Sequence, residues 1–143
     1  MLKGIPDIIS PDLLKILHEM GHGDELVIVD ANFPAASNAK RLIRCDGHDL
    51  LTVLDAILQL FPLDIYVDEP VSIMQVVPGE QAVPVIHDEI IQLVCRYDTR
   101  GENAVGYVER FDFYGQAQNA YAIVATTERK LYGCVIIKKG IIV

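Results

Sequence analysis

Residues 19–35 read EMGHGDELVIVDANFPA, and this stretch carries the clearest strand signal in the chain. The run LVIV is continuously apolar, which is typical of a strand covered on both faces of a parallel sheet. The strand is predicted to end at Asp30, where the apolar run stops. In front of it Gly21 and Gly23 flank His22, and Gly21 is a natural stop for a preceding helix. The stretch therefore predicts a helix end, a glycine-framed loop and a buried strand in succession.

The rest of the chain alternates helix patterns with short apolar runs. The first helix is predicted to start at Ser10, an N-cap residue followed by proline, and to end at Gly21. Further helices are expected within residues 48–62 and 83–97 and near 113–120, and further strands within residues 39–47 and 70–79, near 105, and within 121–125 and 132–143. This alternation predicts a single three-layer α/β/α domain over residues 1–143, with a mostly parallel or mixed central sheet.

The composition narrows the function classes. The chain has 143 residues, 51% of them hydrophobic, and a net charge of -8. This acidic balance argues against a nucleic acid or an anionic membrane surface as partner, and no apolar run approaches the roughly 20 residues of a membrane span. The three cysteines, at positions 45, 95 and 134, are widely spaced and form no CxxC pair. They are expected to be reduced thiols in or near the core of a cytoplasmic protein rather than a disulfide framework or a zinc site.

Two candidate functional residues, His22 and Asp30, flank the predicted strand. In α/β sheets ligands usually bind at the carboxyl ends of the strands, which is where Asp30 is expected. Histidine side chains donate or accept a proton near neutral pH, and the glycines leave His22 unshielded, so the two residues are candidate acid–base partners at a crevice. The alternative is purely structural: a helix-terminating loop and a turn-forming aspartate. No metal site with His18 is expected, because Gly21 ends the helix between the two histidines.

The C-terminal third holds a second group of candidates. Arg110 offers a fixed fork of donors suited to hydroxyl groups, and Tyr114 and Tyr132 offer a polar tip and an apolar face, both useful against a sugar. The structural alternative for the tyrosines is partial burial at the edge of a helix or strand. Spacing alone does not place these groups in one pocket with His22. Surface or capping roles are expected for His48 and His87, and the lysine pair at 138–139 is expected at a solvated strand edge.

Three long blocks of the chain resemble one known family. They read MGHGDELVIVDANFPA, ERFDFYGQAQNAYAIVATTER and YGCVIIKKG, and they occur in the order that the family shows. The family is that of the D-ribose pyranases and L-fucose mutarotases, and the resemblance covers nearly the whole chain. The block that contains RFDFYGQAQ is closer to the fucose branch than to the ribose branch.

The resemblance implies an enzyme that interconverts the α and β anomers of a free monosaccharide, L-fucose in the first place, by acid–base opening and reclosure of the ring. It implies no cofactor and no metal, and a ring-shaped homodecamer with each sugar site at a junction between subunits. By residue matching, His22 is implied as the catalytic proton donor, and Asp30 as its carboxylate partner and a sugar ligand. The other implied sugar-binding positions are Arg110, Tyr132, Gly133 and Cys134, with Tyr114 beside them.

The chain departs from the family pattern at two positions. Cys134 stands where the family commonly has an asparagine, and Asn32 stands where the fucose branch has a histidine. A thiol is a poor hydrogen-bond donor, so the preferred sugar stays open among L-fucose, D-ribose and D-galactose. Three alternatives remain: a D-ribose pyranase-type mutarotase, a sugar-binding module without catalysis that does not need His22, and a protein whose ring assembly is itself the function.

Overall fold

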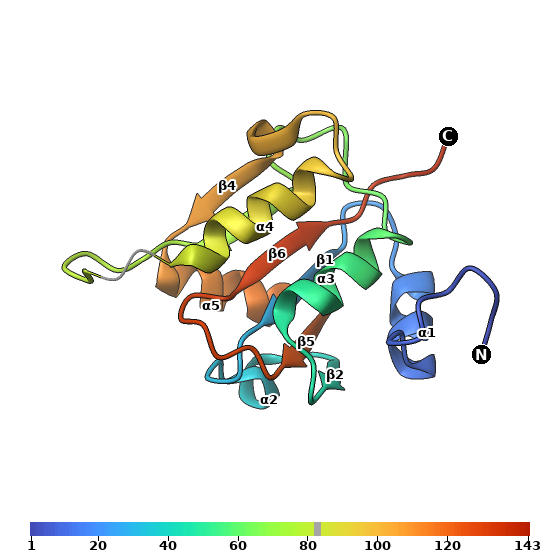
Figure 1. Ribbon diagram of the computed structural model, residues 1–143, viewed down its shortest axis with the longest axis horizontal. Coiled ribbons are helices and arrows are strands. Elements are labelled where there is room, and N and C mark those ends of the chain that lie inside the picture. Colours follow the sequence, from blue (N-terminus) through green and yellow to red (C-terminus); the bar gives the residue numbers. More distant parts are fainter. Residues whose placement is uncertain (82–83) are drawn as a thin grey trace.

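In the computed structural model, which describes residues 1–81 and 84–143, these residues form one six-stranded sheet with helices on both faces (Figure 1). The strands lie in the order β2-β5-β1-β6-β3-β4. Neighbouring strands are parallel except at β6, which runs antiparallel to both β1 and β3. The strands are β1 (Glu25–Val29), β2 (Leu42–Cys45), β3 (Val71–Met74), β4 (Val105–Val108), β5 (Ala122–Thr126) and β6 (Val135–Lys138).

The helices cover the two faces of the sheet. One face carries α1 (Pro11–Glu19), α3 (Leu50–Leu58) and α4 (Val85–Cys95), and the other carries α2 (Ala35–Asn38) and α5 (Arg110–Asn119). A short 3-10 helix, η1 (Gly101–Ala104), precedes β4. Figure 1 shows α3 and α4 in front of the strands and α5 behind them. The predicted three-layer α/β/α architecture with a mixed sheet is therefore confirmed. The stretch predicted as the third helix begins at residue 83, which lies outside the described residues.

The central strand β1 explains why its sequence is continuously apolar. Leu26 and Ile28 pack into the cluster under α1, α3 and α4, whereas Val27 and Val29 pack into the cluster under α2 and α5. All four side chains are fully buried. Because successive residues of a strand point to opposite faces, a strand covered on both sides needs apolar residues at every position. The strand predicted from the sequence is confirmed in place, and it ends at Val29, directly before Asp30.

Side chains at the two ends of α1 determine where this helix begins and stops. Ser10 caps it by accepting a hydrogen bond from the Leu13 N–H at 3.1 Å, as predicted. At the other end Lys139 Nζ donates to the carbonyl oxygens of Leu17 and Met20, which have no partner within the helix. The ammonium group also complements the negative end of the helix dipole. The predicted solvated role is therefore wrong for Lys139, which holds the helix end just before the His22 loop.

Two helices differ from their prediction. The sequence predicts a later start for α5, whereas the helix begins at Arg110 because the Glu109 carboxylate accepts hydrogen bonds from the N–H groups of Phe111 and Asp112. This earlier start places Arg110 in the first turn of the helix. The helix α2 is not predicted at all, since four residues are too few to show a helical period.

Strand direction assigns the site residues to two ends of the sheet. Because β1, β3, β4 and β5 run the same way, the residues that follow them lie together with those that precede the antiparallel strand β6. We call this the Asp30 end, and it holds Asp30 and the loop 127–134. We call the opposite end the His22 end, and it holds His22 and the loop 64–70.

Candidate active site

Asp30 directly follows β1 and is buried, with 7% of its surface exposed. Its Oδ1 accepts hydrogen bonds from the backbone N–H groups of Asn32 and Phe33, both at 3.0 Å. Its Oδ2 faces the Cys134 thiol, whose sulfur lies 3.6 Å away and donates to it. Burial raises the pKa of Asp30 and the charge of Glu128 adds to this, although the hydrogen bonds oppose it. Asp30 therefore takes up a proton at a higher pH than an exposed aspartate does.

A cleft of about 370 Å³ opens beside Asp30. It is bordered by α2 and by the ends of β2 and β5, and its polar lining includes Arg44 and Thr126. Among the residues that the structure describes, Asp30 is the one predicted sugar-binding residue that lines this cleft. One chain by itself therefore gives Asp30 an open, partly polar surface rather than a pocket shared with the other predicted residues.

The loop 127–134 carries Tyr132 and Gly133 to the Asp30 end. Tyr132 has a φ of 61°, the only positive value among the described non-glycine residues. A Cβ atom at Gly133 would lie 3.0 Å from both Glu128 Cγ and Ile86 Cδ1, so these two side chains would have to shift to admit it. A backbone conformation like that of Tyr132 costs about 1–3 kcal/mol and persists only where the surroundings hold it. Two buried polar side chains provide this support.

His87, on α4, is the first of these supports. Its ring is buried, and Nε2 lies 3.1 Å from the Tyr132 carbonyl oxygen, which can only accept, so the Nε2–H donates. Burial lowers the pKa of His87 by more than this hydrogen bond raises it, so the ring is neutral at neutral pH. The predicted surface or capping role is therefore wrong for His87. A sequence signal existed, because His87 shares the apolar face of its helix with Ile90 and Val94 at i, i+3, i+7 spacing.

Glu128 is the second support, and it is 5% exposed. Its Oε1 accepts from the N–H groups of Arg129 and Lys130 at 2.9 Å, and its Oε2 accepts from the Leu50 N–H at 3.3 Å. Its backbone carbonyl accepts from the Ala31 N–H at 2.9 Å. Glu128 thus ties the loop to the start of α3 and to the turn after Asp30. The sequence does not reveal this role, because the contact with Leu50 spans 78 residues.

Arg110 and Tyr114 lie one turn apart on α5. Arg110 Nε donates to the Tyr114 hydroxyl at 3.2 Å, and the Tyr114 ring packs on Phe33 with 5.2 Å between ring centroids. Tyr132 packs against the same apolar cluster and lies close enough to Arg110 to interact with its charge. At the Asp30 end the structure therefore gathers six of the predicted residues: Asp30, Arg110, Tyr114, Tyr132, Gly133 and Cys134.

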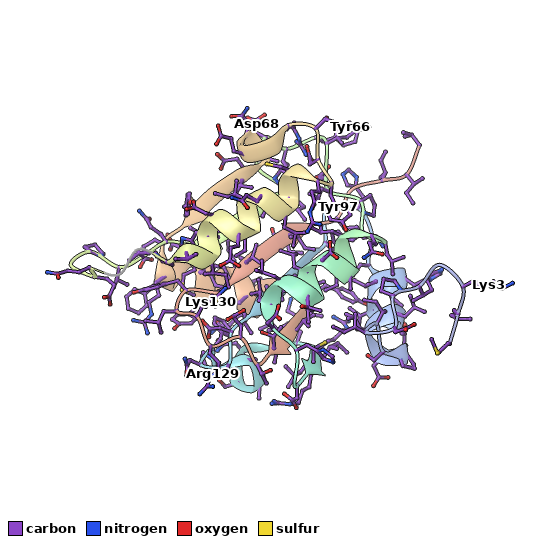
Figure 2. The ribbon with its side chains drawn as sticks, viewed as in Figure 1. Lys3, Tyr66, Asp68, Tyr97, Arg129 and Lys130 are labelled. Atoms are coloured by element: carbon purple, nitrogen blue, oxygen red, sulfur yellow. The ribbon has the colours of Figure 1, made fainter. Side chains whose placement is uncertain are left out.

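His22 lies at the other end of the sheet. The five residues of β1 between it and Asp30 span roughly 16 Å at about 3.3 Å per residue. His22 instead contacts Asp64, with Nε2 3.1 Å from Oδ1, and the Tyr66 ring, with centroids 5.4 Å apart. Figure 2 shows Tyr66 and Arg129, which belong to the two different ends, on opposite sides of the molecule. Within one chain the predicted contact between His22 and Asp30 is therefore not made, and Asp64 is the carboxylate partner that sequence reasoning missed.

The two ends have different chemical capacities. The Asp30 end combines a buried carboxyl group, an exposed guanidinium group and aromatic surfaces, which suits a ligand with several hydroxyl groups. The His22 end offers a half-exposed imidazole on a buried carboxylate, an arrangement that can move a proton. Within the described part of the chain, no three His, Cys, Asp or Glu side chains converge to hold a metal ion, and no helix there has the length and apolar character to cross a membrane.

The sequence profile of the RbsD / FucU transport protein family matches residues 3–142. The chain belongs to this family. An L-fucose mutarotase from Actinobacillus pleuropneumoniae is 48% identical over 141 residues, which cover 99% of this chain and 97% of that protein. Two solved structures, FucU from Bifidobacterium longum and the fucose mutarotase in complex with L-fucose from Streptococcus pneumoniae, are each 50% identical and have TM-scores of 0.96 and 0.93. Both alignments cover 99% of this chain and 100% of the other, which confirms the resemblance seen in the sequence.

Proposed function

We propose that this protein is an L-fucose mutarotase, an isomerase that interconverts the α and β anomers of the free sugar. The observation that carries the proposal is similarity along the whole chain, at 48% and 50% identity, to two proteins named as fucose mutarotases. The chemistry at the two sheet ends supports it, because one end suits hydroxyl groups and the other suits proton transfer. We further propose that residues 1–143 act as one mutarotase domain.

The reaction needs proton transfer and no redox step. In ring opening, one group takes the proton of the anomeric hydroxyl, and the electrons of that O–H bond form the new carbonyl. The bond between the anomeric carbon and the ring oxygen breaks, and a second group delivers a proton to the ring oxygen. The carbonyl rotates and the same transfers run in reverse on its other face. General acid–base help of this kind accelerates a reaction by about 10²–10⁴-fold.

In this proposal His22 is the proton donor, and the residues of the Asp30 end bind and orient the sugar. Asp30 accepts from sugar hydroxyl groups and Arg110 donates to them, while Tyr132 and Tyr114 pack against the ring. Gly133 and Cys134 bring the backbone of the loop close to Asp30. The Cys134 thiol is 2% exposed and already donates to Asp30, so this position acts on the sugar chiefly through Asp30 and its own backbone.

His22 and Asp30 can serve the same sugar only when they come from different chains, since they lie at opposite ends of the sheet. This placement supports an oligomer in which the His22 end of one chain faces the Asp30 end of a second. Large apolar side chains are exposed at both ends, with Ile65 and Tyr66 at one, and Phe111 and Leu131 at the other. Such surfaces suit burial between subunits. The proposal is the ring-shaped decamer that the family resemblance implies, with a sugar site at each junction.

We place the protein in the cytoplasm. Its three cysteines are all unpaired. Cys45 and Cys134 are buried thiols, as predicted, whereas Cys95 is exposed, so the prediction of a place in or near the core is wrong for Cys95. Free thiols of this kind are typical of proteins kept in a reducing compartment.

Saturation-transfer proton NMR on equilibrated L-fucose tests the proposed activity. One anomeric proton is irradiated and the loss of signal at the other is followed with and without protein, with D-ribose and D-galactose measured in parallel. We expect protein-dependent transfer with L-fucose that is lost in His22→Ala. The matched control is His18→Ala, because His18 is an exposed histidine on the neighbouring helix end.

The outcomes separate the alternatives. Transfer with D-ribose but not with L-fucose would identify a ribose pyranase-type mutarotase. Sugar binding without transfer, unchanged in His22→Ala, would identify a non-catalytic sugar-binding module and contradict the proposal. A folded oligomer that neither binds nor exchanges any of the three sugars would also contradict it, and would leave assembly as the function.

A further inference from the structure

We infer that Asp64 is a positioning residue that keeps a proton on Nε2 of His22, so that Nδ1 is the nitrogen that exchanges a proton with the sugar. The inference rests on the proposed function for its second half, the exchange with the sugar. Its first half, the position of the proton on the ring, is independent of that function and rests on the contacts and the charge of the Asp64 carboxylate. No residue of the loop 64–70 is part of the site deduced from the sequence.

The contact between the two side chains is short and anchored. His22 Nε2 lies 3.1 Å from Asp64 Oδ1, and Asp64 is 3% exposed, whereas the His22 side chain keeps 45% of its surface exposed. The Nε2 atom of the imidazole is therefore hydrogen-bonded to the buried carboxylate, while the rest of the ring stays accessible to a ligand. A carboxylate can only accept a hydrogen bond. The nitrogen that faces it must carry the proton, and this nitrogen is Nε2.

Asp64 is ionised at neutral pH. Burial raises its pKa, but hydrogen bonds from the Tyr66 N–H, at 3.0 Å, and from the His22 ring outweigh burial, so the net shift is downward. Two cationic side chains, Arg100 and Lys138, are close enough for their charges to interact with Asp64, but each pairs with another carboxylate. Arg100 pairs with Asp98 at 2.7 Å, and Lys138 lies 3.4 Å from Glu25. His22 is therefore the charged or chargeable group that contacts the Asp64 carboxylate directly.

The backbone around Asp64 is fixed as well, which limits where its carboxylate can point. The Asp64 N–H donates to the Lys138 carbonyl at 3.0 Å, and Arg100 donates to the Asp64 carbonyl at 2.9 Å. Because both backbone polar groups of Asp64 are hydrogen-bonded, its carboxylate has a fixed position and can orient the His22 ring. The glycine-framed loop of His22 gives that ring freedom, and Asp64 restricts it to one orientation.

The consequence for the reaction follows from the two protonation states of the ring. In the neutral ring the proton stays on Nε2, which donates a hydrogen bond to the Asp64 carboxylate. Nδ1 then presents a lone pair, which can accept the proton of the anomeric hydroxyl. In the cationic ring Nδ1–H can deliver a proton to the ring oxygen, while the carboxylate stabilises the positive charge. Nδ1 is thus the nitrogen that faces the sugar in either protonation state, and the proposed role of His22 as proton donor belongs to the cationic ring. Nε2 remains bound to Asp64 in both states.

The test reads the position of the proton directly. Two-bond ¹H–¹⁵N spectra of the full-length protein, labelled at its four histidines, distinguish a protonated ring nitrogen from an unprotonated one, and the spectrum of His22→Ala assigns His22. We expect the neutral His22 ring to be protonated at Nε2 alone. In Asp64→Ala the ring nitrogens should shift toward a mixture of both tautomers. We also expect kcat for L-fucose exchange to fall about 10–100-fold, which is part of the roughly 10²–10⁴-fold that general acid–base help supplies, with KM changed much less.

Two further variants keep the inference falsifiable. Asp64→Asn retains an acceptor but loses the charge, so it should preserve the Nε2–H tautomer and recover part of the lost kcat, even if Asp64→Ala folds poorly. Asp68→Asn removes an exposed carboxylate from the same loop and should change neither readout. A neutral His22 protonated at Nδ1, or a folded Asp64→Ala with wild-type kcat, would overturn the inference. Absence of exchange by the wild-type protein would contradict the proposed function instead, and the tautomer spectrum would still be decisive here.

Discussion

Asp30 is a buried carboxyl group whose two oxygens have unequal partners. Oδ1 accepts two backbone N–H groups, whereas Oδ2 faces a thiol. Burial therefore raises its pKa despite the hydrogen bonds. A carboxyl group with a raised pKa in the folded state contributes stability when it is protonated, and this contribution is lost as the pH rises through the folded-state pKa. At neutral pH the ionised form of Asp30 thus lowers the stability of the fold.

We predict that Asp30→Asn raises the melting temperature at neutral pH and lowers L-fucose exchange by about 10²-fold or more. The gain in melting temperature should shrink as the pH falls toward the range in which Asp30 is itself protonated. Calorimetry over a pH series and saturation-transfer NMR measure the two effects. Asp46→Asn is the control, because Asp46 is exposed and paired with Arg44, so its removal should bring no gain. A lower melting temperature for Asp30→Asn at neutral pH would contradict this account.

Among the elements, the loop 127–134 is closely packed around Gly133. Gly133→Ala should destabilise the protein by about 1–3 kcal/mol, because its Cβ would press on Glu128 and Ile86 at 3.0 Å. Gly115→Ala is the matched control: no atom lies within 4 Å of the added Cβ, and the residue is in the middle of α5. It should stabilise by about 0.5–1 kcal/mol. Urea unfolding measures the unfolding free energy of both variants. Equal changes in this free energy for Gly133→Ala and Gly115→Ala would contradict the packing argument.

The support that His87 gives this loop leads to a prediction of its own. His87→Ala leaves the Tyr132 carbonyl without its donor and should cost about 1–3 kcal/mol of unfolding free energy. It should also weaken L-fucose binding, because Tyr132 is then free to leave its strained conformation. His87→Gln can still donate and should recover part of both losses, while His48→Ala, at an exposed histidine, should change neither. Unfolding curves and a fucose titration test this, and unchanged affinity in His87→Ala would show that the loop does not depend on the hydrogen bond.

The elements also show what sequence patterns can and cannot predict. The strand β1 and the helices α1, α3 and α4 are predicted well because each has a clear apolar period or cap. The roles of Asp64 and Glu128 depend on contacts with residues 42 and 78 positions away, and no local pattern encodes such contacts. For His87 only part of the role was predictable. Its place on an apolar helix face indicated that the ring is buried, but no sequence pattern indicated its hydrogen bond to the Tyr132 carbonyl oxygen.

At the scale of the whole molecule, the separation of His22 and Asp30 was available from the sequence. One residue precedes a strand and the other follows it, so the two must lie at opposite ends of the sheet. What the sequence could not show is which surfaces meet when copies assemble, because this depends on the shapes of both ends together. The structure shows the two halves of the chemistry at opposite ends of one chain, and the proposed ring brings them together at each junction.

Complementation between two inactive variants tests whether each sugar site takes His22 from one chain and Asp30 from another. His22→Ala and Asp30→Asn are co-expressed with different tags, oligomers that carry both tags are purified, and L-fucose exchange is measured by saturation-transfer NMR. If each site takes His22 from one chain and Asp30 from another, roughly a quarter of the junctions in a random ring contain both intact residues. We therefore expect the mixed oligomers to recover roughly a quarter of the wild-type exchange rate, while each variant alone stays at about a hundredth of the wild-type rate or below. Mixed oligomers that stay as inactive as the separate variants would show that both residues act within one chain, and would contradict it.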